Sequence, residues 1–173
     1  MRRVQACAVL IGCLFAMTVF GPAQTRKPGL WELTTTMTWQ QSPLPPGMVA
    51  GGGEHSPFSG VPHTTQVCLT QQQIDKYGAI MPTTRGCSLT HVVKKSNSMT
   101  ADMVCTGMMS GKGTLESSWT DDDHATGKMH FVGAMEFSGN SKPVEWTTAS
   151  HSVFKGADCG SVKPNPIMPD KDK

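Results

Sequence analysis

Four cysteines lie in segments whose polar and apolar residues alternate, and no other feature constrains the fold of this chain as strongly. They are Cys68, Cys87, Cys105 and Cys159. Alternation with a period of two is typical of β-strands with one buried face. An even number of cysteines in an exported chain indicates disulfides. The sequence therefore predicts an all-β domain cross-linked by two disulfides.

The first 23 residues have the three parts of a signal peptide. Residues 1–3 are positively charged, residues 4–20 are almost wholly apolar, and small residues precede a cleavage site after Ala23. The apolar run is shorter than the roughly 20 residues that a membrane-spanning helix needs. We therefore expect a periplasmic or secreted protein with no stable transmembrane segment in its mature chain.

The segment Leu10-Ile11-Gly12-Cys13 offers a second interpretation. It resembles a bacterial lipobox, in which Cys13 would carry a lipid and become the mature N-terminus. Cleavage there would leave the apolar residues 14–20 on the mature protein, whereas a hydrophobic region normally ends at its cleavage site. We prefer the cleaved signal peptide and keep a lipid anchor through Cys13 as the alternative.

Net charge excludes two classes of partner. Without Arg2 and Arg3 the chain keeps 13 of its 15 Lys and Arg residues, equal in number to its 13 Asp and Glu. A neutral chain without a basic run has no electrostatic attraction to nucleic acid or to an anionic membrane. The rest of the chain suits a single domain at residues 24–159, followed by a disordered, proline-containing tail at 160–173.

The alternating segments recur along the chain. In the first of them, Trp31, Leu33 and Met37 share one face. Residues 40–62, rich in Pro and Gly, predict a long flexible loop. We expect an antiparallel meander of about seven strands that forms a barrel or a strongly curved sheet, because long open edges promote aggregation. The expected strands lie at residues 31–39, 64–69, 87–93, 99–105, 111–119, 125–137 and 144–154.

One short helix interrupts the strands. Thr70 and Gln73 have the spacing of a capping box, in which each side chain satisfies a backbone N–H of the other residue. Gly78 is suited to end the helix. The sequence predicts a helix near residues 70–77.

A hairpin about residues 95–97 aligns two apolar faces. It places Val93 opposite Met99 and Cys87 opposite Cys105. Directly opposed strand positions bring Cβ atoms to about the separation that a disulfide requires. We therefore favour Cys87–Cys105, which leaves Cys68–Cys159, over the two other pairings that four cysteines allow.

A second hairpin is predicted at Gly139-Asn140, a two-residue turn of the II′ kind. Its register pairs Met135 with Val144 and Gly133 with Trp146, which places a large ring over a glycine. On the outer face the same register sets Lys128 opposite His151, with His130 diagonal to His151.

No motif of catalysis or cofactor binding has the required spacing. Residues 107–114 resemble a phosphate loop, but only three residues separate Gly107 from Gly111-Lys112, so we expect a turn. Residues 121–123 lack the Gly at position six and the Glu at position twelve of an EF-hand, and we expect a hairpin turn. Neither a nucleophile elbow nor a C-x-x-C pair occurs. We predict no enzyme, no catalytic residues and no cofactor.

Soft-metal binding is an alternative. Beyond residue 23 the chain has ten methionines and six histidines, and thioether and imidazole groups suit Cu(I). Most of the methionines in strands fall on predicted core faces, where methionine is common filler. We therefore assign no metal ligands. The remaining place for copper is a cluster of Met48, His55, His63, Met108 and Met109.

Two resemblances add to these expectations. Gly29-Leu30-Trp31 is similar to the G-x-W motif of lipocalins, which implies a pocket for a small apolar ligand at the mouth of a barrel. A longer pattern resembles a family of small exported bacterial proteins catalogued as a domain of unknown function. It covers most of residues 28–159 and consists of Pro28-Gly29-Leu30-Trp31-Glu32-Leu33-Thr34, Val67-Cys68-Leu69-Thr70, Gly86-Cys87, Val104-Cys105-Thr106-Gly107, the stretch 111–115, Gly127-Lys128-Met129 and Asp158-Cys159.

The family resemblance implies a periplasmic or cell-envelope protein with structural cysteines, and it transfers no catalytic or binding residues. We expect a non-catalytic binding or structural module, with an envelope protein or a small apolar ligand as its partner.

Overall fold

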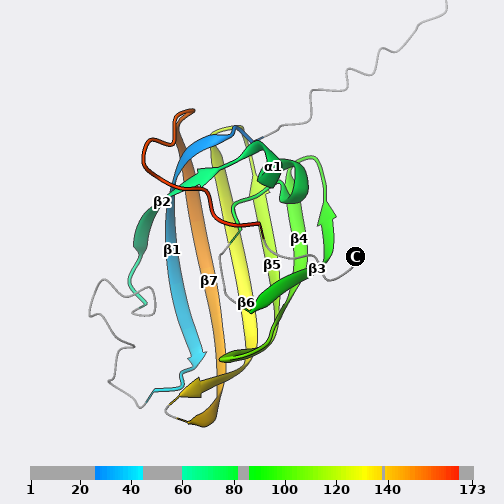
Figure 1. Ribbon diagram of the computed structural model, residues 1–173, viewed down its shortest axis with the longest axis vertical. Helices are drawn as coiled ribbons and strands as arrows, with labels where there is room; N and C mark the ends of the chain where they lie inside the picture. Colours follow the sequence, from blue (N-terminus) through cyan, green and yellow to red (C-terminus); the bar gives the residue numbers. More distant parts are fainter. Residues whose placement is uncertain (1–25, 45–59, 82–85, 138, 168–173) are drawn as a thin grey trace, which may run out of the picture.

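The computed structural model describes residues 26–44, 60–81, 86–137 and 139–167. Over these ranges the chain forms one sheet of seven antiparallel strands and one short helix (Figure 1). The predicted signal peptide, Cys13 and most of the predicted loop at 40–62 lie outside the described residues. The elements are β1 (Gly29–Gln41), β2 (His63–Leu69), α1 (Gln71–Tyr77), β3 (Cys87–Lys94), β4 (Ser98–Cys105), β5 (Met109–Trp119), β6 (His124–Phe137) and β7 (Asn140–Gly156).

The strands lie in the order β2-β1-β7-β6-β5-β4-β3. Strands β3 to β7 form a meander, β1 pairs with β7, and β2 pairs with the other side of β1. In the described part of the chain β2 and β3 do not pair with each other, so the sheet is curved but open (Figure 1). The predicted all-β meander is confirmed as a curved sheet and not as a closed barrel.

Both predicted disulfides are present. Cys87 and Cys105 are directly opposed on β3 and β4 and are bonded to each other. Cys68, near the end of β2, is bonded to Cys159, which follows β7 at a separation of 91 residues. A cross-link over a loop of this length restricts the unfolded chain, and the chain-entropy account gives a stabilisation of about 4 to 5 kcal/mol.

The β3–β4 hairpin departs from the predicted register near its turn. Val93 lies opposite Thr100, not opposite Met99. A β-bulge just before Val93 inserts a residue, and His91 within the bulge has a φ of 48°. The insertion turns Val92 toward the core and leaves Val93 51 % exposed. The prediction was wrong here because simple alternation assumes that no residue is inserted.

Strands β6 and β7 pair two residues away from the predicted register. Strand β6 ends at Phe137 and β7 begins at Asn140, which the prediction places in the turn. As a result, Gly133 lies opposite Val144 rather than Trp146, and Met135 lies opposite Lys142 rather than Val144. A shift of two residues keeps every side chain on its predicted face.

The ring of Phe131 accounts for this register. Phe131 is fully buried and lies opposite Trp146, and the two rings stack with 5.3 Å between their centroids. A Cβ atom built on Gly111 or Gly133 would lie 2.9 Å from the Phe131 ring, and one built on Gly113 would lie 3.4 Å from it. The three glycines therefore make room for Phe131, whereas the sequence argument assigned Gly133 to Trp146.

Helix α1 forms as predicted. The Thr70 hydroxyl accepts a hydrogen bond from the Gln73 N–H, and the Gln73 side chain accepts one from the Thr70 N–H, which completes the capping box. Gly78 ends the helix in the left-handed region at a φ of 72°. Lys94 of β3 donates to the carbonyls of Ile74 and Asp75 and so fixes the helix to the sheet.

The C-terminal segment packs against the fold, although the sequence predicts disorder from residue 160. Pro164 forms an isolated bridge with Cys68, the Gln73 side chain donates to the Asn165 carbonyl at 2.8 Å, and Ile167 packs against the main core. Figure 1 shows this segment (red) and α1 lying across the same side of the sheet.

Among the described residues, two apolar clusters make up the core. The larger lies between the inner faces of β3 to β7 and the end of α1. The smaller surrounds Trp31, with Leu69 and Ile74 against it. Within the described ranges, no helix has the length and apolar character needed to cross a membrane.

Candidate functional site

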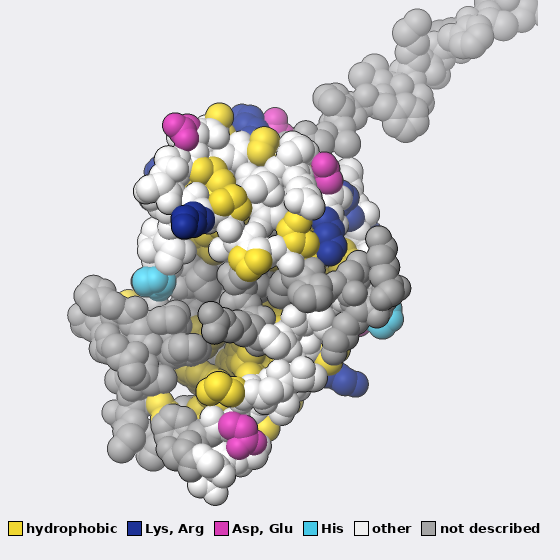
Figure 2. Space-filling model, in the orientation of Figure 1, with side chains coloured by type: hydrophobic (Ala, Val, Ile, Leu, Met, Phe, Trp, Pro, Cys, Tyr) yellow, Lys and Arg dark blue, Asp and Glu magenta, His cyan; other side chains and the backbone are white. Residues whose placement is uncertain are grey.

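The concave face of the sheet holds a cavity of about 450 Å³. Its floor is formed by β1, β5, β6 and β7, and Ile80, which follows α1, also lines it. Figure 2 shows hydrophobic side chains in the hollowed middle of this face. The volume falls within the range of roughly 300 to 1,000 Å³ that is usual for small-molecule sites.

A row of four small residues creates the hollow. Thr35 on β1 lies opposite Ser150 on β7, Ser150 lies opposite Gly127 on β6, and Gly127 lies opposite Ser117 on β5. Side chains stand roughly perpendicular to a sheet, so four short ones in adjacent strands leave a trough across it. We call these four the small-residue row.

Larger apolar side chains border the row on one side. Met37, Thr148, Met129 and Leu115 form the next row of cross-strand neighbours, and Trp146 follows beyond them. This part of the cavity has a largely apolar floor, and the exposed, directly opposed Glu116 and Lys128 also line the cavity. The apolar residues that line the cavity as a whole are Leu33, Met37, Ile80, Met109, Leu115, Met129, Met135 and Trp146.

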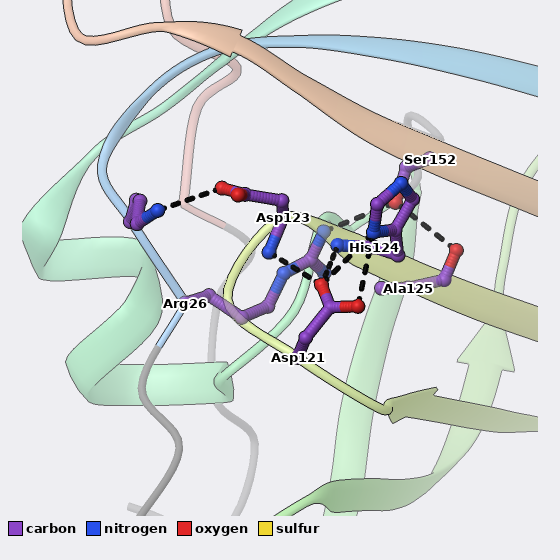
Figure 3. Close-up of polar contacts among 7 residues, drawn as sticks. Arg26, Asp121, Asp123, His124, Ala125 and Ser152 are labelled. Carbon is purple, nitrogen blue, oxygen red and sulfur yellow. Dashed lines mark hydrogen bonds and ion pairs between the residues drawn. The ribbon is translucent and has the colours of Figure 1, made fainter.

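The opposite side of the row contains a buried arginine beside Ser152 and Leu33, which are directly opposed on β7 and β1. Arg26 is 4 % exposed and lines the cavity. Its Nη2 donates to Ser152 Oγ at 3.0 Å, as Figure 3 shows, and its Cζ lies 4.1 Å from the centroid of the Trp31 ring. Its Nε is buried and has no hydrogen-bond partner among the described residues. Burial lowers the pKa of Arg26 to about 10.

Neighbouring contacts hold Arg26 in place. Lys27 Nζ lies 2.8 Å from Asp123 Oδ1 in the β5–β6 turn, and the Lys27 carbonyl accepts from Trp31 Nε1 at 3.0 Å. The hydrogen bond to Asp123 raises the pKa of Lys27. Asp121 in the same turn accepts the backbone N–H groups of Asp123 and His124, and these bonds lower its pKa. The segment before β1 is thus fixed to an ordered turn.

The methionine and histidine cluster considered for copper is not assembled by the described residues. Met108 is 79 % exposed, whereas Met109 lines the cavity. His63 begins β2, which β1, β7 and β6 separate from β5. Met48 and His55 lie outside the described residues. Within the described ranges there is no group of three or more His, Cys, Asp or Glu side chains that would hold a metal ion.

The outer-face histidines also differ from the prediction. His151 lies opposite Thr126, not opposite Lys128, because of the two-residue difference in the β6–β7 register. His130 Nε2 lies 2.9 Å from Glu145 Oε1. The His151 ring stacks on that of His124 with 6.2 Å between their centroids, so His130 and His151 take part in separate interactions.

The two loop motifs lie in turns and strands. Residues 107 and 108 form a bend, and the remaining residues of the segment 107–114 belong to β5. Residues 121–123 lie in the turn between β5 and β6, as expected.

A second depression, of about 410 Å³, lies on the convex face. Its described lining is largely polar and includes Thr36, Thr38 and Thr147, together with His130 and Lys128. It lacks the continuous apolar wall of the concave cavity, which is therefore the better candidate site for a ligand.

The family described as Protein of unknown function (DUF3617) matches residues 26–159. The chain belongs to this family. The DUF3617 match includes the buried Arg26 and all four disulfide cysteines, and it confirms the resemblance inferred from the sequence. No curated protein and no solved structure matches the chain.

Sequence reasoning missed the two features that define this DUF3617 cavity. Arg26 precedes the alternating segment, and no sequence pattern marks a single buried arginine. The members of the small-residue row were identifiable as inward-facing positions, but their alignment depends on the β6–β7 register. The predicted register would have placed Gly127 opposite Ser152 instead of Ser150.

Proposed function

We propose that this protein is an exported, non-catalytic binding module that holds a small apolar ligand on the concave face of its sheet. The observation that carries the proposal is the cavity of about 450 Å³ with its apolar lining. Removing apolar surface from water is favourable by roughly 25 cal/mol per Å², so a ligand that displaces water from these side chains gains free energy. The open sheet replaces the closed barrel that a lipocalin-like site would use.

The lining residues support binding rather than catalysis. Hydroxyl groups at Thr35, Ser150 and Ser152 face the cavity, but none of the described histidines lines it, and the lining carboxylate Glu116 is exposed on the outer face. A serine or threonine nucleophile needs an adjacent base to take its proton. The cysteines of the domain are joined in disulfides and are unavailable as nucleophiles.

The disulfides support export. Such bonds persist in oxidising compartments and are rare in the cytosol. Together with the signal-peptide features of the first 23 residues, they favour the periplasm or the extracellular medium as the place where the cavity meets its ligand.

A fluorescence titration tests the proposal. Trp146 lines the cavity, so a bound ligand changes the surroundings of its indole ring. We expect hexadecanol to produce a saturable change in tryptophan emission of the wild-type protein. Ser150→Phe places a ring in the small-residue row and should weaken binding at least tenfold. Ala149→Phe is the matched control, because Ala149 is the preceding residue on the same strand and lies on the outer face.

Two outcomes would contradict the proposal. One is the absence of a saturable response in the wild-type protein. The other is equal hexadecanol affinity in Ser150→Phe and wild type, with circular dichroism showing that the variant is folded. A loss of binding in Ala149→Phe alone would move the ligand to the convex face.

Copper binding is a second candidate, and one observation favours it. Met37, Met109, Met129 and Met135 all line the same cavity, with Met109 and Met135 directly opposed on β5 and β6. Thioether groups are suitable Cu(I) ligands. If Cu(I) raises the thermal midpoint of the wild-type protein but not that of a Met129→Leu, Met135→Leu double variant, the cavity is a metal site. Those leucines keep the wall apolar, so hexadecanol binding should survive in the double variant.

A further inference from the structure

The cavity contains a buried cation that lacks a negatively charged partner within the described chain. Arg26 is 4 % exposed, and its described hydrogen bond goes to the neutral hydroxyl of Ser152. Its Nε is buried and unpartnered among the described residues. A guanidinium group has five N–H donors, and burying a charged group without charge pairing is costly.

The acidic residues near Arg26 are engaged elsewhere. Asp123 is paired with Lys27, and Asp121 accepts hydrogen bonds from the backbone N–H groups of Asp123 and His124 within its own turn (Figure 3). Arg26 takes part in none of the ion pairs between described residues. Burial is the cause of its lowered pKa, with no carboxylate acting in the opposite direction. The Trp31 ring covers one face of the guanidinium. The N–H groups lie in the guanidinium plane and point outward from its edge, so the stacked ring does not accept their hydrogen bonds.

The cavity has a buried positive charge at one side and an apolar wall at the other. Arg26 and Ser152 lie at one side, the hydroxyls of the small-residue row follow, and the apolar wall around Met129 and Trp146 lies beyond them. This sequence of surfaces matches a molecule with one charged head and one hydrocarbon tail.

We propose that the ligand is a long-chain carboxylic acid whose carboxylate pairs with Arg26 and whose hydrocarbon chain lies along the apolar wall. The proposal rests on the function proposed above and names its ligand class. A carboxylate carries the single negative charge that balances one guanidinium, and its two oxygens match the fork of N–H donors. A phosphate monoester has similar oxygens, but its charge of about −2 would leave part of the charge unbalanced.

The test compares hexadecanoate with hexadecanol, which has the same chain and an uncharged head. Wild type should bind hexadecanoate more tightly at neutral pH. Arg26→Gln should weaken hexadecanoate binding by about 10- to 100-fold, the range for a charge-assisted hydrogen bond, and should change hexadecanol affinity by a much smaller factor. Lys27→Gln is the matched control, since it removes the adjacent, exposed cation and should change neither affinity.

Two further measurements separate a direct role for Arg26 from a merely structural one. Arg26→Lys keeps the charge without the fork and should restore part of the hexadecanoate affinity. Wild-type affinity for hexadecanoate should fall as pH is lowered through the carboxyl pKa of about 4 to 5, and Arg26→Gln should not show this dependence. Hexadecyl phosphate should bind wild type more weakly than hexadecanoate.

The outcomes distinguish the two levels of the proposal. If wild type binds hexadecanol but hexadecanoate no more tightly, or if Arg26→Gln weakens both equally, the carboxylate inference is wrong and the apolar site remains. Tighter binding of hexadecyl phosphate would overturn the choice of carboxylate. If neither hexadecanol nor hexadecanoate binds, the proposed function fails and the inference with it. If Arg26→Gln does not fold, the affinities for hexadecanoate and hexadecanol are compared in Arg26→Lys instead. An equal fall in both affinities would contradict the inference.

Discussion

Arg26 donates a hydrogen bond to Ser152 across 3.0 Å and so joins the segment before β1 to the inner face of β7. Ser152 in turn donates to the Ala125 carbonyl on β6 at 3.4 Å. The hydroxyl therefore has both a donor and an acceptor, whereas the guanidinium keeps an unpartnered, buried Nε among the described residues. The ligand-free protein thus contains a destabilising charge beside its cavity.

Replacing this charge should stabilise the ligand-free protein. Arg26→Met keeps an unbranched side chain over Trp31 and removes the buried cation. The loss of the Ser152 hydrogen bond and of the Trp31 contact opposes part of this gain, so we expect a net increase of about 1 kcal/mol in the free energy of unfolding, measured in urea. A clear loss of stability in Arg26→Met would identify Arg26 as a structural residue.

The effect of Arg26 on stability has a defined pH range. The folded-state pKa of about 10 lies below the unfolded value, so the unfavourable contribution is fully present below pH 10 and declines only as pH rises above that value. The stability difference between Arg26→Met and wild type should therefore be constant throughout the neutral and mildly acidic range.

The local sequence determined much of this fold because short-range patterns set most of its elements. Alternation identified the buried faces, the capping box identified α1, and two opposed thiols identified the Cys87–Cys105 hairpin. Each of these patterns depends on residues that lie close together along the chain or face each other across one turn. The long pairing of β1 with β7 could not be found this way, because no local signal links strands more than 100 residues apart.

Features that depend on exact register were harder to predict. The bulge at His91 moved the strand partners of β3 and reversed the faces of Val92 and Val93, whereas the two-residue shift between β6 and β7 moved strand partners and kept every face. The cavity depends on such partners, because Gly127 must face Ser150 and Ser117 at once. A cavity formed by small side chains is therefore harder to predict from the sequence than a core formed by large ones.

Two glycines on the inner face should respond differently to the same substitution. A Cβ atom on Gly113 would lie 2.7 Å from the backbone oxygen of His130, so Gly113→Ala requires the strands to move and should cost about 1 to 3 kcal/mol. A Cβ atom on Gly127 would lie 2.6 Å from Ser150 Oγ, which can rotate away into the cavity. Gly127→Ala should stay within about 1 kcal/mol of wild type. If Gly113→Ala and Gly127→Ala lower the free energy of unfolding in urea equally, Gly127 does not border open space.

The β5–β6 turn should make stability depend on pH through Asp121. Backbone N–H groups of Asp123 and His124 lower the pKa of this carboxyl below 3.8. A carboxyl whose pKa is lower in the folded state than in the unfolded state contributes to stability. This contribution is fully present above the unfolded-state pKa and is lost as pH falls through the folded-state pKa. Asp121→Asn should therefore lower the thermal midpoint at neutral pH, and its difference from wild type should shrink below pH 3.8. Asp122→Asn removes the same charge from the same turn and should show a smaller effect.

The two disulfides should contribute unequally to stability. In the chain-entropy account, the separation of 18 residues between Cys87 and Cys105 corresponds to about 3 kcal/mol, and the separation of 91 between Cys68 and Cys159 corresponds to about 4.5 kcal/mol. The double variant Cys68→Ser, Cys159→Ser should therefore unfold at a lower urea concentration than Cys87→Ser, Cys105→Ser. Each pair is replaced together so that no free thiol remains to form a wrong bond. Removing the Cys68–Cys159 disulfide should also release the C-terminal segment, because Pro164 pairs with Cys68. Amide exchange at residues 160–167 should therefore be faster in Cys68→Ser, Cys159→Ser and unchanged in Cys87→Ser, Cys105→Ser. The reverse order of stabilities would show that restriction of the unfolded chain is not the main effect.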